Sequence, residues 1–287
     1  MNIGLLYSRI REDEKLLLTE LRNRGHEVTK IDVRNLQFGL DEPPTALNSV
    51  DIAFNRALES SRVRYIAQFV DHYDIPVVND PETARICADK VRGSLALQEA
   101  RVPTPRTEVS FSVESALESI ERFGYPCVLK PVTGSWGRLI ARIDSRSAAE
   151  AVLEHKATLG HYEHKVFYVQ EFVEKPGRDI RVVATDGAPV AGMVRSSDHW
   201  LTNAAKGATV SEFTVTDEVH ELVERASTAV GGGLLGIDLM ELGSAGYTVH
   251  EVNSTCEFKA LNQAAANVNV PARIVDWVEE RADRVAA

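Results

Sequence analysis

GIDLMELGSAGYTVHEVN, residues 236–253, carries the strongest structural signal in this chain. Two short runs rich in apolar residues flank the turn-forming segment Gly-Ser-Ala-Gly, and this arrangement predicts a β-hairpin with strands over 235–241 and 247–253. Upstream of the hairpin, short apolar runs alternate with helical patterns, an order that is typical of α/β proteins. We therefore expect an α/β fold that contains this hairpin near its end.

The polar side chains of the hairpin are oxygen donors. Residues two apart in a strand point to the same face, so Glu251 and Asn253 should project together. If Asp238 faces them across the hairpin, two carboxylates and one amide oxygen converge. Such hard oxygen ligands suit Mg²⁺, and Mn²⁺ accepts the same donors. Taken alone, the pattern fits equally well a polar face of a solvated hairpin.

The composition limits the classes of function. A chain of 287 residues exceeds one typical domain of about 150 residues, which predicts two domains or three small lobes. With 44% hydrophobic and 26% charged residues the chain should be globular, because disordered chains are poor in apolar residues. A net charge of −10 argues against a protein that grips nucleic acid, because phosphates are neutralised by clustered Lys and Arg.

The sequence gives no indication of secretion or of a membrane span. Its N-terminus lacks a basic segment followed by an apolar one, and no apolar run approaches the roughly 18 residues that a bilayer requires. Cys87, Cys127 and Cys256 are too widely spaced for a disulfide framework or a zinc site. We therefore expect a cytoplasmic protein that binds neither membrane nor nucleic acid.

Three units are expected along the chain. Residues 1–88 alternate strands and helices as in an open α/β lobe with a parallel sheet, and Pro81 should interrupt the chain near the end of this lobe. Residues 89–170 begin with a helix and continue in a strand–helix–strand–strand–helix order, which predicts a small α+β lobe. A strand over 165–172 leads into the third unit, residues 171–287, which should be a second α+β lobe with the hairpin.

A glycine-bounded loop follows the strand expected to end at Lys130. The loop reads Pro-Val-Thr and then Gly134, Ser135, Trp136 and Gly137. Glycines let backbone N–H groups approach phosphate oxygens, and the lysine supplies a positive charge. The segment fits a phosphate-binding lid or a plain surface hairpin. It is not a Walker loop, because the Gly-Lys-Ser/Thr ending is absent from the sequence.

The segment Asp-His-Trp-Leu-Thr-Asn, residues 198–203, places polar side chains around Trp200. Arg195 and Lys206 border it, so the loop suits a zwitterionic substrate whose carboxylates need cations nearby. A loop anchored by one buried indole explains the same residues equally well.

The order of these motifs along the chain is more specific than any one of them. Together they resemble the ATP-grasp ligases over nearly the whole chain, and most closely the LysX/ArgX branch, which is related to the RimK-type glutamate ligases. The resemblance implies three lobes, with ATP enclosed by the second and third. It rests on Lys90, Lys130-Pro-Val-Thr-Gly-Ser-Trp-Gly-Arg138, Gln170-Glu-Phe-Val173, Asp179-Ile-Arg181, Arg195, His199-Trp-Leu-Thr-Asn203, Asp238 and Glu251-Val-Asn-Ser-Thr-Cys-Glu-Phe-Lys259.

The resemblance implies a binding site for ATP, which is a substrate of these enzymes. Lysines would contact the nucleotide, the glycine loop would cover its phosphates, and the segment after the strand over 165–172 would meet adenine. The residues implied are Lys90, Lys130, Gly134, Ser135, Trp136 and Gly137 for the phosphate side, Gln170, Glu171 and Val173 for adenine, and Asp179 for the ribose.

The resemblance also implies a metal site and the catalytic groups. A bound Mg²⁺ and positively charged side chains would neutralise the phosphate being transferred, and a residue of the substrate loop would assist. The residues implied are Asp238, Glu251 and Asn253 for the metal, and Arg195, Lys130 and Asn203 for catalysis.

In this branch the enzyme activates the side-chain carboxylate of a C-terminal glutamate on a small acidic amino-group carrier protein. It then couples this carboxylate to the α-amine of α-aminoadipate in lysine biosynthesis, or of glutamate in arginine biosynthesis. Some members read Ala-Arg-Gly-Gly where this chain reads Ala-Lys-Gly-Ala at 205–208, so the resemblance leaves the amino acid open. The family also suggests a homodimer or homotetramer.

Two acidic proteins repel each other, so a carrier would need basic residues where it docks. Arg138, Lys175, Arg178 and Lys206 are the candidates. Two other functions fit the same motifs: a RimK-type ligase that adds glutamate to a protein tail, and an ATP-binding scaffold without catalysis.

Overall fold

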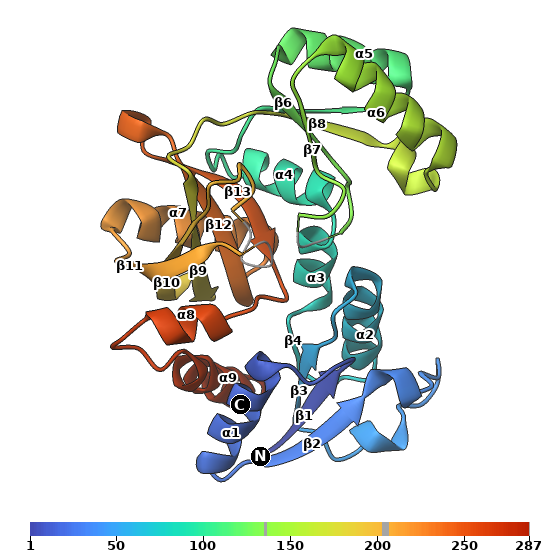
Figure 1. Ribbon diagram of the computed structural model, residues 1–287. Helices are drawn as coiled ribbons and strands as arrows, with labels where there is room; N and C mark the ends of the chain where they lie inside the picture. Colours follow the sequence, from blue (N-terminus) through green and yellow to red (C-terminus); the bar gives the residue numbers. More distant parts are fainter. Residues whose placement is uncertain (135–136, 203–206, 287) are drawn as a thin grey trace.

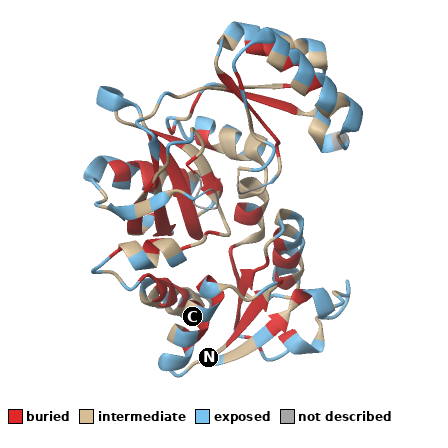
Figure 2. Ribbon diagram, in the orientation of Figure 1, coloured by how far each residue is buried: buried red, intermediate tan, exposed pale blue. Residues whose placement is uncertain are grey.

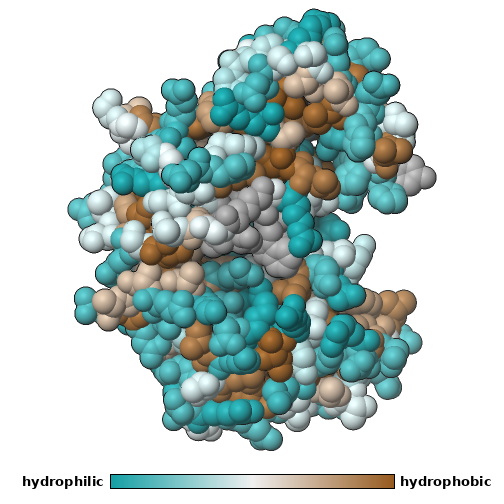
Figure 3. Space-filling model, in the orientation of Figure 1, coloured by the Kyte–Doolittle hydropathy of each residue, from teal (hydrophilic) through white to brown (hydrophobic). Residues whose placement is uncertain are grey.

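The strands of the chain form three sheets within the ranges that the computed structural model describes, which are residues 1–134, 137–202 and 207–286. Each sheet has its own helices, and the three units follow one another in sequence (Figure 1). The outline of the molecule narrows between the second unit and the first (Figure 3). None of the helices in the described ranges is long and apolar enough to cross a membrane.

The N-terminal lobe is an open α/β unit, as the sequence predicts. Its four strands run parallel in the order β2-β1-β3-β4, and β1, β3 and β4 are largely buried while the edge strand β2 is not (Figure 2). The carboxyl ends of such strands form a crevice at one edge of the sheet. The elements are β1 (Asn2–Tyr7), α1 (Glu12–Asn23), β2 (Glu27–Asp32), β3 (Ile52–Arg56), α2 (Ser60–His72) and β4 (Val77–Val78).

The expected interruption at Pro81 is wrong. Pro81 is the first residue of helix α3 (Pro81–Cys87), because proline lacks only an N–H that the first turn of a helix does not use. Helix α4 (Lys90–Glu99) follows, and the Asp89 side chain caps it by accepting hydrogen bonds from two backbone N–H groups. The cap fixes Lys90 at the start of the helix.

The second sheet is antiparallel in the order β5-β8-β6-β7, and helices α5 and α6 cover one of its faces (Figure 1). The strand expected over 165–172 is β8, which lies inside this sheet between β5 and β6 and does not simply lead into the third unit. Apolar side chains of both helices and of the strands form one core. The elements are β5 (Thr107–Ser110), α5 (Val113–Phe123), β6 (Cys127–Lys130), β7 (Ala141–Ile143), α6 (Arg146–Leu159) and β8 (Phe167–Glu171).

The third sheet is also antiparallel, in the order β11-β10-β9-β12-β13. Helix α7 packs on one face, and helices α8 and α9 pack on the other together with the N-terminal lobe. Strand β11 and helix α8, both short and largely polar, do not follow from the sequence pattern. The elements are β9 (Arg178–Thr185), β10 (Ala188–Ser196), β11 (Thr209–Phe213), α7 (Asp217–Val230), β12 (Leu234–Glu241), β13 (Tyr247–Asn253), α8 (Lys259–Ala264) and α9 (Val270–Ala286).

A segment that we call the strap, residues 254–259, connects β13 to helix α8 and is held by the N-terminal lobe. The Asp13 carboxylate on α1 accepts hydrogen bonds from the backbone N–H groups of Phe258 (2.7 Å) and Lys259 (2.8 Å). Asp13 therefore caps the start of α8 from a distant part of the chain. The strap begins directly after Asn253, so the contact links this lobe to the candidate metal ligands.

Buried charges reinforce the contact between the lobe and the strap. Arg56, at the end of β3, is 1% exposed and donates to the Cys256 carbonyl oxygen (3.1 Å) and to the Glu14 carboxylate (3.0 Å). Glu14 also accepts from Arg11, which pairs with Glu257 of the strap at 2.6 Å. These ion pairs compensate the cost of removing the charges from water.

Asn79 provides a third contact, at the start of β12. Its amide group donates to the carbonyl oxygens of Leu234 and Ser254, both at 2.8 Å, and accepts from the Leu234 N–H at 2.7 Å. Gly233 passes so close that a Cβ atom there would lie 2.3 Å from Asn79 Oδ1, and its φ is +99°. Only glycine fits this position without displacing Asn79.

Replacing Glu14 should destabilise the protein strongly. Glu14→Ala leaves the Arg56 guanidinium buried without its carboxylate, and we expect a loss of about 3–5 kcal/mol in the free energy of unfolding. Urea denaturation of the two proteins measures it. Glu12→Ala, which removes an exposed pair with Lys15 on the same helix, is the control and should have no measurable effect. Equal midpoints for wild type and Glu14→Ala would show that the pair does not hold the lobes.

Candidate active site

The hairpin of β12 and β13 brings the three oxygen donors together. Its register sets Asp238 directly opposite Glu251 and Gly236 opposite Asn253. The Asn253 side-chain nitrogen lies 3.5 Å from an oxygen of Asp238. The structure therefore places Asp238 across from Glu251 and close to the side chain of Asn253, which is the condition on which the predicted oxygen set depends.

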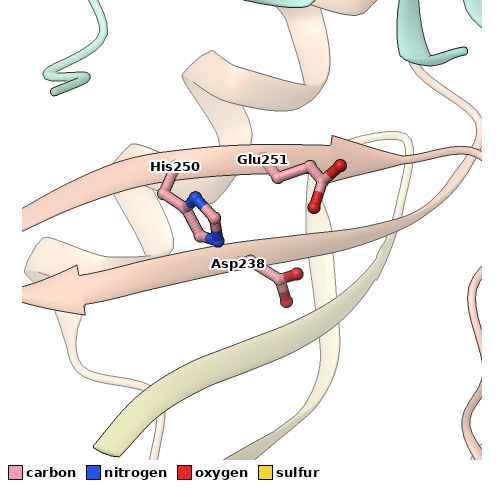
Figure 4. Close-up of side chains that lie close together, drawn as sticks. All are labelled: Asp238, His250 and Glu251. Carbon is pink, nitrogen blue, oxygen red and sulfur yellow. The ribbon is translucent and has the colours of Figure 1, made fainter. Parts of the chain in front are cut away.

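A β-bulge adds a fourth side chain to this face. The register shifts between Asp238, which pairs with Glu251, and Leu239, which pairs with Val249, so His250 is the extra residue. Ligand atoms of Asp238, His250 and Glu251 all lie within 4.8 Å of one another, and Figure 4 shows their side chains on the same side of the hairpin. Strict alternation places His250 on the opposite face, which is why sequence reasoning missed it.

Two arginines keep Asp238 charged although it is 2% exposed. Arg181 on β9 donates to both carboxylate oxygens, at 2.7 and 2.6 Å, and Arg195 on β10 lies 3.1 Å from one of them. Burial opposes ionisation, but the attraction of the two guanidinium groups outweighs it and holds the pKa of Asp238 well below its usual range. The carboxylate is therefore ionised at any ordinary pH, and both of its oxygens contact guanidinium groups.

The Asp179 carboxylate is engaged by protein groups. Arg195 donates to one oxygen at 2.7 Å and the Thr202 hydroxyl donates to the other. Lys175 donates to the same hydroxyl at 2.7 Å and lies 3.7 Å from the carboxylate. Asp179 therefore orients Arg195 and ties Thr202, in the segment after β10, to the sheet.

Lys130 lies at the end of β6 and is 5% exposed. Polar side chains surround its ammonium group. It donates to Gln170 Oε1 at 2.5 Å and contacts His250 Nδ1 at 3.2 Å. The Gln170 amide group in turn donates to Thr107 and Tyr168, so its orientation is fixed. Burial, together with Lys90 and Lys175, lowers the pKa of Lys130 to about 8 despite the nearby carboxylates.

Lys90 contacts both the glycine loop and the candidate metal ligand Glu251. Its ammonium nitrogen lies 3.1 Å from a Glu251 oxygen and donates to the Gly134 carbonyl oxygen at 2.9 Å. Gly134 and Gly137 have φ angles of +117° and +64°, which side chains rarely permit. The expected nucleotide contacts at Ser135 and Trp136, and the expected catalytic residue Asn203, lie outside the described residues.

Two cavities meet at these side chains, and Gly134 and Glu251 line both. The first lies between the second and third sheets. The second, about 400 Å³, opens toward the N-terminal lobe and has the size of a small-molecule site. The first is lined by Lys90, Lys130, Gly134, Gly137, Gln170, Glu171, Val173 and Asp179 among others, and the second by Arg181, Arg195, Asn253, Lys259 and residues of the strap.

The basic residues expected at a docking mouth are largely paired within the protein. Arg178 donates to both oxygens of Glu241, at 2.6 and 2.8 Å, and Lys175 contacts Thr202 and Asp179 as described above. Arg138 lines the first cavity, and Lys206 lies outside the described residues.

Comparisons with known proteins point to one family over nearly the whole chain. Residues 3–86 match the LysX preATP-grasp domain and residues 87–278 match the RimK-like ATP-grasp domain. The chain is 32% identical to the alpha-aminoadipate–LysW ligase LysX of Saccharolobus solfataricus, covering 94% of this chain and 99% of that one. It is 29% identical to the glutamate–LysW ligase ArgX of Sulfurisphaera tokodaii, covering 98% and 99%.

A solved structure is similar over the same length. The RimK domain ATP-grasp protein of Sphaerobacter thermophilus superimposes with a TM-score of 0.79 at 26% sequence identity, covering 97% of this chain and all of that one. The expected arrangement, an open α/β lobe followed by two α+β lobes of the ATP-grasp type, is confirmed by this likeness and by the domain matches.

His250 should contribute to the pH dependence of stability. Burial and the neighbouring Lys130 lower its pKa to about 4 from an ordinary value of 6.5. Between these values the unfolded chain binds more protons, so the free energy of unfolding should rise with pH, by up to about 3 kcal/mol from this group, and level off above 6.5. His250→Asn should lack this rise. Urea denaturation of both proteins from pH 4.5 to 7 measures the difference, and parallel profiles would contradict it.

Proposed function

The chain belongs to the RimK-like ATP-grasp ligases, in the branch of the LysX and ArgX proteins, and we propose that it links a carrier protein to an amino acid. ATP activates the C-terminal glutamate side chain of a small acidic amino-group carrier protein, and the α-amine of α-aminoadipate or glutamate then forms the amide. The observation that carries the proposal is the convergence of Asp238, Glu251 and Asn253 where two cavities meet.

The proposed reaction has two steps. A carboxylate oxygen of the carrier attacks the γ-phosphorus of ATP, the new O–P bond replaces the bond to the β-phosphate oxygen, and ADP leaves. The neutral amine then attacks the acyl carbon, the C–O bond to phosphate breaks, and the amine loses a proton to solvent as amide and phosphate form. Phosphoryl transfer of this kind needs positioning and charge neutralisation rather than a protein nucleophile.

We assign the metal to Asp238, Glu251 and Asn253. Their oxygens are the hard donors that Mg²⁺ prefers, and Mn²⁺ accepts the same set. When bound, the ion neutralises charge on the phosphate oxygens. The arginine pairs that keep Asp238 ionised support this assignment, because a protonated carboxyl would be a poor ligand.

We assign the nucleotide to the first cavity. Lys90 and Lys130 face its phosphate end beside Glu251, while Gln170, Glu171 and Val173 line its adenine end. Gly134 and Gly137 cover the phosphates, where their backbone conformation permits close approach. Asp179 lines the same cavity, and its contact with Arg195 indicates that it supports this arginine as well as the ribose side of the site.

We assign the carrier's glutamate and the incoming amino acid to the second cavity. Arg195 reaches this cavity from β10 and would face the transferred phosphate. Arg181 and Lys259 supply positive charge for carboxylates, and Glu257 supplies an anion for an amine. Gly134 separates the two cavities, so a lid over the first also shields the acyl phosphate from water.

The other functions have less support. A scaffold that binds ATP without catalysis has no need of a buried carboxylate such as Asp238, which two arginines keep ionised. A ligase that adds glutamate to a protein tail would share every feature of the nucleotide site, so only the acceptor distinguishes it.

Measurement of ADP release in the presence of a purified carrier protein tests whether the carrier is the substrate. Glutamate and α-aminoadipate are offered separately, and we expect turnover with one or both. A carrier that lacks its C-terminal glutamate is the control and should support none. Turnover only with an unrelated protein tail ending in glutamate would replace this proposal with the tail-modifying function.

Removal of a metal ligand should abolish ligation. Glu251→Ala takes away one of the two carboxylates, and we expect ADP release to fall by at least about a hundredfold at saturating ATP. Glu241→Ala is the matched control, because Glu241 lies on the same hairpin but pairs with Arg178 at the surface. Its rate should match the wild type. Equal rates for all three proteins would remove Glu251 from the metal site.

A further inference from the structure

The bulge residue His250 lies between the Lys130 ammonium group and the candidate metal ligands. No part of the expected ligand set, and no nucleotide contact that the family resemblance implies, includes it. The register shift in β13 sets both His250 and Glu251 against Asp238. A polar side chain delivered to this point by an extra residue requires an explanation.

The contacts of Lys130 fix the orientation of its ammonium group. Among the described residues, two acceptors contact the ammonium nitrogen: Gln170 Oε1 at 2.5 Å and His250 Nδ1 at 3.2 Å. An ammonium group has three N–H donors, so two are directed by these side chains. Because Lys130 lines the first cavity, the third is available for an oxygen of the nucleotide there.

The contact with Lys130 also fixes the proton on the imidazole ring. A lysine ammonium group can only donate, so Nδ1 of His250 must accept and the ring proton must be on Nε2. Figure 4 shows the second ring nitrogen turned toward Asp238. In this tautomer Nε2, the ring nitrogen on the side of Asp238, carries the hydrogen and has no lone pair for a metal ion.

His250 also keeps the ammonium group away from the carboxylates. Lys90 is the lysine that pairs with Glu251, at 3.1 Å, and both carboxylates attract Lys130 as well. A second lysine on Glu251 or Asp238 would compete with the metal for the same oxygens. The imidazole lies beside both carboxylates and offers Lys130 an uncharged acceptor.

We propose that His250 is a positioning residue that holds the Lys130 ammonium group toward the nucleotide phosphates and away from the metal ligands. The proposal rests on the assignment of ATP to the first cavity and does not depend on which acceptor is ligated. His250 acts through Lys130, so its effect requires that lysine. It serves ATP binding and phosphoryl transfer, with the acceptor nitrogen Nδ1 as the essential atom.

Binding of a non-hydrolysable ATP analogue with Mg²⁺, measured by calorimetry, tests the proposal without any acceptor. His250→Leu removes the acceptor, and we expect the analogue to bind about tenfold to a hundredfold more weakly, the effect of losing one hydrogen bond to a charged group. His250→Asn should bind within about threefold of the wild type, because an Asn side-chain oxygen can replace Nδ1. His250→Gln, whose amide extends further, should resemble His250→Leu.

The same substitution in a protein that lacks Lys130 separates a positioning role of His250 from a structural one. In a Lys130→Met protein, His250→Leu should not weaken binding of the analogue any further, because His250 acts through the ammonium group that is missing there. Equal losses in both backgrounds, or a His250→Asn protein as weak as His250→Leu, would overturn the proposal. Binding of Mn²⁺ alone, followed by electron paramagnetic resonance, should be the same in wild type and His250→Leu. A loss there would make His250 a metal ligand instead.

These measurements also distinguish failure of the inference from failure of the proposed function. Nucleotide binding that follows the expected pattern, in a protein that ligates no carrier, supports the role of His250 and rejects the acceptor. A carrier ligase whose His250 variants all bind the analogue like wild type keeps its function and rejects the inference. Thermal unfolding of each variant confirms that the compared proteins are folded.

Discussion

The site depends on a row of four alternating charges buried in the third sheet. Arg181 faces Asp238 across the β9–β12 register, Asp179 faces Arg195 across the β9–β10 register, and Arg195 reaches Asp238 as well. Burying any one of these charges alone would be strongly unfavourable, but each has an opposite charge within hydrogen-bond distance. The row therefore keeps a carboxylate ionised in the interior of a sheet, which is what a cation site needs. The order of the strands, and not any loop, sets its geometry.

Much of this arrangement follows from the sequence. The alternation of Glu251 and Asn253 predicts that they share a face, because residues two apart in a strand do so. The sequence leaves open whether Asp238 faces them, and in the structure the bulge in β13 sets Glu251 opposite Asp238. The parallel N-terminal sheet follows from alternating strands and helices. These features depend on local patterns, which a single sequence contains.

Other features depend on tertiary contacts that the local pattern does not record. Pro81 begins a helix instead of interrupting the chain, and the position of a proline relative to a helix cannot be read from its identity alone. The short strand β11 exists because β10 pairs with it, although its own residues are largely exposed. The bulge at His250 breaks the two-residue period on which the prediction of faces depends. The partners of Arg181, Arg195 and the strap lie tens to hundreds of residues away in the chain.

The strap gives the N-terminal lobe a mechanical role in the site. Its backbone is gripped at Cys256, Phe258 and Lys259 by side chains of that lobe, while its first residue follows a candidate metal ligand directly. A rotation of the lobe would therefore move the strap, which is only a few residues long, and with it Asn253 at the end of β13. The Asn253 side chain is therefore positioned by two lobes at once, so the orientation of the N-terminal lobe helps to determine where this side chain lies beside Asp238.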